Sequence, residues 1–337
     1  FVLLRGGFKM FPPYVAGMIL LHDMRRPIRM HRCSARGMLP LTHFEDPTMR
    51  RTVPLLLLLY LLGLLQGCSA VRLGYGHADS LARWWIDQYV DLSPEQDSLV
   101  QERLPRFFAW HRKTQLPDYV AVLRQGQQFV AGQPTLADAH ALDESIVRRV
   151  RTAANQAIPD VADLLASLGP SQIDRIAARY AEKNLEYAKE AGLSDGEAAQ
   201  RKARQMRMLE RAEYWFGDLN GDQRASLQRM IDAQESGAQF RYEERLRRQR
   251  ELLDLARQVQ REKPTRERVI QLLRDYAARF DLPPDPARRT RALALRRAAA
   301  ELTVAVLAMT TPAQRAHARQ KLDDLIGDFT QLSQEAS

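Results

Sequence analysis

Hydrophobic positions recur at helical spacing over most of the chain. Apolar side chains after residue 77 follow one another at intervals of three and four, as in the stripe of Leu81, Trp84, Trp85 and Tyr89. No stretch shows the sustained alternation of apolar and polar residues, with β-branched enrichment, that is typical of strands, and Ala, Leu, Arg, Gln and Glu dominate. The pattern predicts an all-α fold, an elongated bundle of about eight to ten helices over residues 78–337. Two packed lobes, 78–191 and 195–337, are one form it can take.

Short polar sequences predict where the helices begin. Four of them place a cap and a glutamine three residues apart, as in a capping box, and a fifth carries Glu instead. They are Ser93-Pro94-Glu95-Gln96, Gly169-Pro170-Ser171-Gln172, Asn220-Gly221-Asp222-Gln223, Thr311-Pro312-Ala313-Gln314 and Ser194-Asp195-Gly196-Glu197. Further starts are expected near 136, 265 and 287, after Thr135, at Thr265 and at the proline cluster of 283–286. Pro105, Pro117 and Pro159 are expected to kink or split helical runs.

An apolar run precedes the helical region. Met49, Arg50 and Arg51 lead into the 13 residues of 53–65, which as a helix would rise about 20 Å, less than the hydrocarbon core of about 30 Å. A positive segment, a short apolar segment and a small residue follow one another in a secretory signal. Residues 49–67 are therefore predicted to be a signal peptide.

The end of this segment, Leu65-Gln66-Gly67-Cys68, resembles a bacterial lipobox. The resemblance implies cleavage between Gly67 and Cys68, a diacylglycerol on the Cys68 thiol and a fatty acyl group on the new amino terminus. One acyl chain gives only marginal, reversible binding to a membrane, so three chains would anchor the protein far more firmly. Ser69 then implies sorting to the outer membrane, facing the periplasm, with residues 68–77 as a lipidated tether. The alternatives are an ordinary signal peptide with an incidental cysteine, or a buried apolar helix.

Residues 1–48 do not fit a lipoprotein signal. We expect them to be an overextension of the start site without regular structure, and the alternative is a cytoplasmic extension ahead of an uncleaved anchor.

The basic excess of the chain, +9 with a pI near 9.7, lies largely before Cys68, since residues 1–67 hold nine Lys or Arg against three Asp or Glu. Nucleic acid is therefore not an expected partner. With Cys33 outside the mature chain and Cys68 acylated, no disulfide is expected.

One wider pattern covers residues 75–119. It consists of Tyr75, Ala78, Asp79, Leu81, Trp84, Trp85, Asp87, Tyr89, Val90 and Leu92, then Trp110-His111-Arg112 and Leu116-Pro117 with Tyr119. This pattern resembles the opening of an uncharacterised family of helical lipoproteins from Gram-negative bacteria. The resemblance implies a location and a fold, and it carries no activity.

The elements Leu92–Gln96, Leu168–Gln172 and Leu219–Gln223 also resemble the Leu-Thr-x-x-Gln boxes of Spy-type periplasmic chaperones. Thr310 takes the leucine position in the fourth copy, which ends at Gln314. Helix capping explains the same boxes without any function. The chaperone likeness therefore covers the boxes alone.

Aromatic residues are concentrated between Trp84 and Tyr119. Trp84, Trp85, Tyr89 and Trp110 are the candidate interaction residues, because a groove for apolar segments would use such side chains. The alternative is that they form the core. Since neighbouring residues point about 100° apart on a helix, Trp84 and Trp85 cannot both face inward.

No catalytic, cofactor or metal site can be derived from the sequence. His77, His111, His140 and His317 lack a paired ligand at helical spacing, and capping or solvation explains Asp79, Asp87 and Asp91. Nucleotide-loop and Gly-x-Ser-x-Gly patterns are absent from the sequence. The basic segment 241–250 is expected to be an exposed helix with internal salt bridges, and a polyanion site is its alternative.

Two functions remain as hypotheses. The first is a non-catalytic, lipid-anchored helical module that binds an envelope protein or shields unfolded chains. The second is an enzyme acting on the cell wall or on lipid, centred on His111 or Asp87. The first hypothesis needs no cofactor apart from the covalent lipid on Cys68. The sequence identifies neither the protein partner nor the oligomeric state.

Overall fold

The described part of the chain is built from helices. The computed structural model describes residues 70–335, which form α-helices, one π-helical turn and short connections, without a strand. The all-α prediction is confirmed. In chain order the elements are α2 (Ala70–Gly76), α3 (Ala78–Val90), α4 (Pro94–Trp110), η2 (His111–Gln115), α5 (Leu116–Ala131), α6 (Leu136–Ala166), α7 (Pro170–Glu190), α8 (Gly196–Phe216), α9 (Gly221–Asp232), α10 (Ala238–Glu262), α11 (Arg266–Phe280), α12 (Pro286–Ala308) and α13 (Pro312–Gln334).

The eight predicted helix starts lie within one residue of the observed ones, because their signals are local, whereas α10 begins at Ala238, where no start was predicted. Complete capping boxes form at the N-caps Ser93, Thr135, Asn220 and Thr311. At Gly169, which has no side chain, only the return bond is made, from the Gly169 N–H to the Gln172 side chain at 3.0 Å. The Glu variant at 194–197 marks the start of α8 but provides no side-chain cap.

Helices α4 and α6 run on through Pro105 and Pro159, so the proline residues do not split them. Tertiary packing offsets the missing backbone hydrogen bond, because α4 and α6 lie against each other and Arg103 of α4 is 2.9 Å from Asp160 of α6. Pro117 lies in the first turn of α5, directly after η2. The backbone is helical from η2 into α5, so the missing Pro117 N–H falls next to the π-helical turn, where the hydrogen-bond pattern changes.

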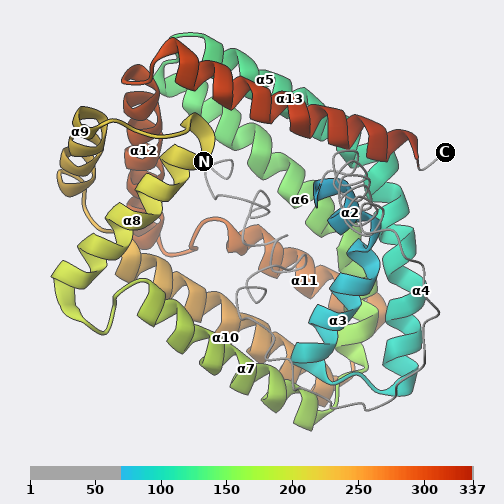
Figure 1. Ribbon diagram of the computed structural model, residues 1–337. Coiled ribbons are helices and arrows are strands. Elements are labelled where there is room, and N and C mark those ends of the chain that lie inside the picture. Colours follow the sequence, from blue (N-terminus) through green and yellow to red (C-terminus); the bar gives the residue numbers. More distant parts are fainter. Residues whose placement is uncertain (1–69, 336–337) are drawn as a thin grey trace, which may run out of the picture.

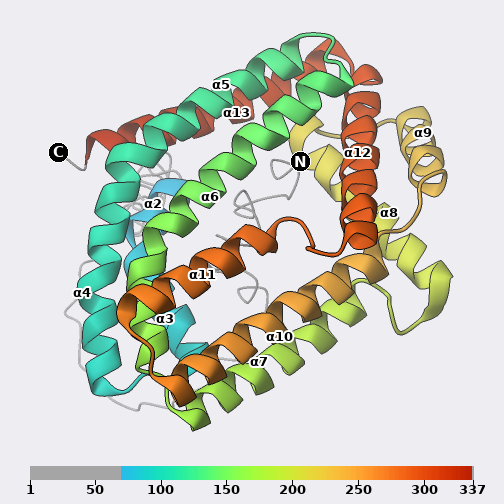
Figure 2. The ribbon, with the colours of Figure 1, turned by 180° about the vertical axis from the view of Figure 1, so that it is seen from behind.

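The helices form a four-sided frame (Figure 1). Helices α5 and α13 lie side by side along one side, and α7 and α10 lie along the opposite side. The third side contains α3 and α4, and the fourth contains α8, α9 and α12. On one face α6 and α11 cross the frame and pack on each other (Figure 2).

The order of the elements repeats once along the chain. A helix, a Leu-x-x-x-Gln box and a further helix occur as α3–α4 and again as α8–α9, and each half ends with a second box that starts α7 or α13. Matched positions are buried alike: Val100 and Leu104 of α4 correspond to Leu227 and Ile231 of α9. The repeat therefore extends from the boxes into the core.

The two halves interlock. Helix α5 of the first half packs on α13 of the second, and α10 of the second packs on α7 of the first. The chain turns between them at 191–195, where the two lobes were expected to meet. Because each half packs against a helix of the other, the two halves do not form separate helical lobes.

Two hydrophobic cores hold the frame together. The larger joins α2 to α5 with α8, α9, α12 and α13, and its buried members include Leu116, Ile231 and Leu322. The smaller lies among α6, α7, α10 and α11 and includes Val259 and Val269. Both cores combine residues from the two halves, so packing of one half depends on the other.

Residues 70–76 were expected to belong to a tether and instead form helix α2. Tyr75 is buried in the larger core, and Arg72 pairs with Asp328 of α13 at 3.3 Å. A buried aromatic and an ion pair to α13 make this segment part of the folded unit. Cys68, the cleavage position after Gly67, the signal segment 49–67 and residues 1–48 lie outside the described residues.

Candidate functional site

The Leu-x-x-x-Gln boxes meet in pairs. Gln96 Nε2 donates to Gln172 Oε1 at 3.1 Å, and Gln172 Nε2 donates to Gln96 Oε1 at 2.6 Å. Each Nε2 also donates, at 3.0 Å, to a backbone carbonyl just before the opposite box, Gln96 to Ser167 and Gln172 to Asp91. We call this pair the first glutamine clasp. It ties the start of α4 to the start of α7.

The second glutamine clasp repeats this geometry at the starts of α9 and α13. Gln223 Nε2 donates to Gln314 Oε1 at 2.8 Å, and Gln314 Nε2 donates back to Gln223 Oε1 at 3.0 Å. The backbone acceptors are Met309 and Asp218, the positions that match Ser167 and Asp91. The boxes therefore cap helices, as predicted, and also join segments distant in sequence.

Removing one glutamine of a clasp should cost more than removing a cap. Gln96→Ala leaves the Ser167 carbonyl and the Gln172 amide without their partner, and we expect it to lower the free energy of unfolding by about 2 kcal/mol. Ser93→Ala removes one capping bond and should cost about 1 kcal/mol. Gln101→Ala, on the exposed face of α4, is the control and should change stability by less than about 0.5 kcal/mol. Urea unfolding measures all three, and equal losses for Gln96→Ala and Gln101→Ala would contradict the clasp.

The four aromatic residues singled out from the sequence do not form one cluster. Trp85 packs on Tyr89 with ring centroids 4.7 Å apart, and Tyr89 contacts Tyr180 of α7 at 5.9 Å. Trp110 packs separately against the larger core. Trp84 is the most open of the four, with 47% of its surface exposed. Adjacent Trp84 and Trp85 thus differ in burial, as their angle on the helix implies.

A buried histidine lies between two tyrosines. His111 is 1% exposed, its Nδ1 lies 2.5 Å from the Tyr75 hydroxyl oxygen, and its Nε2 lies 3.2 Å from that of Tyr119. A neutral imidazole has one N–H and one acceptor nitrogen, so one tyrosine donates to it and the other accepts from it. His111 also opens the π-helical turn η2, a backbone form frequent at functional sites.

Burial holds this network in its uncharged state. It lowers the pKa of His111 from its ordinary value near 6.5 to about 4, since an imidazolium would lose its hydration. Burial also raises the pKa of the Tyr75 and Tyr119 hydroxyls above the ordinary tyrosine value. His111 lines neither the apolar cavity described below nor the polar cavity between α5 and α6. The network therefore acts as part of the core.

The acidic residues of α3 have structural partners. The Asp87 carboxylate accepts the Leu92 N–H at 3.0 Å, which satisfies the backbone after the helix end. Asp91 takes a left-handed conformation there and pairs with Arg175 at 3.4 Å. Over residues 70–335, His, Cys, Asp and Glu form no group able to hold a metal ion.

The basic segment 241–250 of α10 is ion-paired, as predicted, but it is half-buried rather than exposed. Arg247 pairs with Glu244 at 2.7 Å and with Glu251 at 2.6 Å. Glu244 is itself buried and also receives Arg288 of α12 at 2.6 Å. The charge pattern of a single helix cannot reveal that neighbouring helices supply its partners. These arginines are therefore part of the packing of α10.

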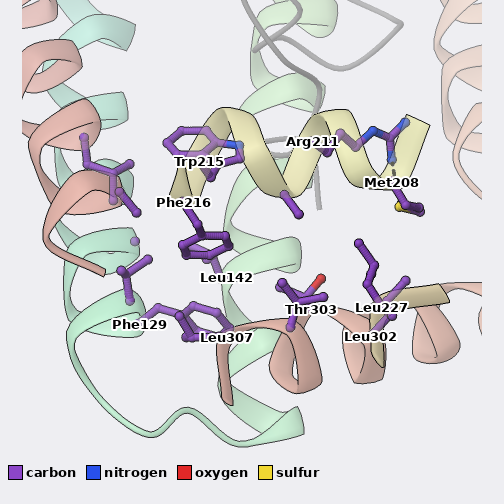
Figure 3. A pocket seen from close by; sticks show the side chains of 16 residues that line it. Phe129, Leu142, Met208, Arg211, Trp215, Phe216, Leu227, Leu302, Thr303 and Leu307 are labelled. Carbon is purple, nitrogen blue, oxygen red and sulfur yellow. Dashed lines mark hydrogen bonds between the residues drawn. The ribbon is translucent and has the colours of Figure 1, made fainter. Parts of the chain in front are cut away.

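The apolar cavity is a feature that sequence reasoning missed. It measures about 90 Å³ and lies where α5, α6, α8, α9, α12 and α13 converge (Figure 3). Phe129, Leu142, Trp215 and Leu307 are among its lining residues. They come from four helices separated in sequence, so no local pattern joins them. The residue in the sequence that could have pointed to this cavity was Trp215, the one tryptophan outside the aromatic segment of residues 84–119.

The described residues form an all-α fold in which buried polar groups join helices that are distant in sequence. Residues 88–280, more than half of the chain, match the protein family described as "Family of unknown function (DUF6279)". The chain belongs to this family, which confirms the expected membership of an uncharacterised family. Neither a curated protein nor a solved structure matches the chain. Lipidation, Gram-negative origin and likeness to Spy-type chaperones stay predictions.

Proposed function

We propose that the protein is a non-catalytic helical module, held at the periplasmic face of the outer membrane by lipids on Cys68, that binds envelope proteins or shields unfolded chains. The lipobox resemblance and the apolar run of 53–65 support the anchor. Within residues 70–335, none of the helices has the length and apolar character needed to cross a bilayer. Membrane lipid through Cys68 and an envelope protein are the partners in this proposal.

Exposed apolar side chains on the two helices that follow Cys68 carry the binding role. Leu73 of α2 is 63% exposed and Trp84 of α3 is 47% exposed, whereas neighbouring Trp85 is packed on Tyr89. Tryptophan is enriched among the residues that contribute most to protein interfaces. A protein segment bound at Leu73 and Trp84 would lie on the part of the fold closest in sequence to the anchor.

An enzyme acting on the cell wall or on lipid is the alternative hypothesis. Its centre was expected at His111 or Asp87. Both ring nitrogens of His111 are hydrogen-bonded to tyrosine hydroxyls, and the Asp87 carboxylate accepts the backbone N–H of Leu92. Because both groups are engaged in holding the fold, these contacts favour the binding role.

Substitutions of the two adjacent tryptophans test the proposal. Trp84→Ala should change the free energy of unfolding by less than about 0.5 kcal/mol, while it impairs severalfold the suppression of aggregation of an unfolded outer-membrane protein. Trp85→Ala should cost about 2 kcal/mol, because this ring is packed on Tyr89. Light scattering of the client and urea unfolding of each variant are the measurements.

The matched control is Leu293→Ala on α12, which removes another exposed large apolar side chain. It should leave both stability and suppression of aggregation unchanged. The binding role would be contradicted by wild-type protein that has no effect on aggregation. If Trp84→Ala and Leu293→Ala suppressed client aggregation equally, Trp84 would have no part in the binding role.

A further inference from the structure

The two halves of the chain, α3 to α7 and α8 to α13, bury their cores against each other. Helix α5 packs on α13, α7 packs on α10, and α6 packs on both α11 and α12. Leu116 of α5 lies in the same core as Leu322 of α13, and Ile173 of α7 lies in the same core as Val259 of α10. A half that separated from the other would therefore expose apolar surface that fits the missing half.

The contacts between the halves are themselves repeated. Pro134 and Thr135 precede α6, and Pro264 and Thr265 precede α11, so α5 and α10 hold the same place in the two halves. Helices α7 and α13 both begin at the second box of their half. The packing of α5 on α13 therefore has its counterpart in the packing of α10 on α7. Each half gives a helix to the other and receives one, as the subunits of a domain-swapped dimer do.

A short turn is the covalent connection between the halves. Residues 191–195 lead from α7 into α8 at a corner of the frame (Figure 1). Gly192 has a φ of 68°, and a Cβ at this position would lie 2.7 Å from the carbonyl carbon of Ala199 in α8. Gly196, the first residue of α8, has a φ of 83°. The tight reversal thus depends on glycine at two positions, whereas an extended connection does not.

We propose that the chain also forms a dimer with a second copy, in which the 191–195 turn opens and each first half packs against the second half of the other copy. Such a dimer keeps every contact between the halves, and the turn alone changes. A second copy is the partner because it presents the same surfaces of α10 to α13 that the first half contacts here. Closure within one chain benefits from a high effective concentration, so the dimer gains as the protein concentration rises.

Crosslinking between full-length chains that are refolded together from urea tests the exchange. One chain carries Gln127→Cys and the other Asp323→Cys, because the Gln127 amide on α5 donates to the Asp323 carboxylate on α13 at 2.5 Å, across the two halves. Both chains carry Cys33→Ala and Cys68→Ala, which removes the native thiols, and an affinity tag marks one of them. We expect a short bismaleimide to join the two chains, with a yield that rises with the protein concentration during refolding.

The matched control is a contact of the same chemistry within one half. Gln205 on α8 donates to Asp232 on α9 at 2.9 Å, and both helices belong to the second half. Chains with Gln205→Cys and Asp232→Cys, refolded together, should not be joined, because exchange keeps this contact within one chain. The proposal is overturned if the Gln127→Cys and Asp323→Cys chains are not joined, or if the control chains are joined to the same extent.

A substitution in the turn should shift the balance toward the dimer. Gly192→Ala places a Cβ against Ala199 in the closed turn but not in an extended connection, so we expect the dimer fraction after refolding to rise about fivefold or more. Size-exclusion chromatography with light scattering measures this fraction. Gly327→Ala on α13 is the control and should leave it unchanged, since a Cβ there meets no atom within 4 Å. An unchanged dimer fraction in folded Gly192→Ala would also overturn the proposal, and if this variant does not fold, the crosslinked pairs decide.

Discussion

Replacing Cys68 with alanine is expected to move essentially all of the protein from the membrane fraction to the soluble fraction. The lipobox resemblance implies three acyl chains on this residue, and each buried CH₂ contributes about 0.8 kcal/mol to membrane binding. A single myristoyl chain gives only reversible association with a constant of about 10⁴ M⁻¹, so three chains make the attachment effectively permanent. Cell fractionation with a high-salt wash measures the distribution.

Ser69→Ala is the control for this substitution, because it leaves the cysteine and the small residue before it in place. It should remain with the membrane. Mass spectrometry of the amino-terminal peptide should find the acyl groups on Cys68 in the wild type. Retention of the Cys68→Ala variant in the outer membrane after the wash would show the anchor assignment to be wrong.

Acidification from pH 7 to pH 4 is expected to destabilise the protein through His111. Its pKa is about 4 in the folded protein and near 6.5 in the unfolded chain. Between these values the unfolded chain binds a proton that the folded protein does not bind. The free energy of unfolding therefore falls as the pH falls, by about 1.4 kcal/mol per pH unit and about 3 kcal/mol over the window. Above pH 6.5 the contribution is complete, and below pH 4 it no longer changes.

Urea unfolding of wild type and His111→Gln at both pH values isolates this contribution from that of the carboxylates. The variant should be less stable than the wild type at pH 7 and should lose about 3 kcal/mol less on acidification. A full pH dependence in His111→Gln would mean that this residue is not held neutral by burial.

Local interactions made the helix starts predictable. An N-cap such as Ser93 and its Gln96 are three residues apart, so one short segment contains both halves of the interaction. The same holds for Asn220 and Gln223. The all-α prediction rests likewise on periodicity within single helices.

Pairing of the boxes could not be predicted, because it depends on how the chain returns on itself. Gln96 and Gln172 are distant in sequence, and a capping box is complete without a second glutamine. The interlocking of the two halves was equally hidden, since it depends on the packing of α5 on α13 and of α10 on α7. Tertiary contacts also explain why α2 is folded, through Tyr75 in the larger core.

The role of His111 illustrates the same limit at the level of a site. As a titratable residue beside aromatic side chains, it was a candidate for catalysis, and its burial between Tyr75 and Tyr119 follows from the packing of three elements. Trp84 and Trp85 were the more predictable case, because the geometry of one helix already requires them to face different directions. Arg211 and Trp215 lie on one helix turn, but the cavity beside them needs six helices.

Binding of envelope proteins at the exposed Leu73 and Trp84 side chains is the central claim, and site-specific photocrosslinking in cells tests it most directly. A photoreactive amino acid replaces Trp84 in one variant and exposed Leu293 of α12 in another. We expect position 84 to yield an adduct with an outer-membrane protein that increases when that protein is kept unfolded, and position 293 to yield none. Equal adducts at both positions, or no adduct at position 84, would contradict the claim.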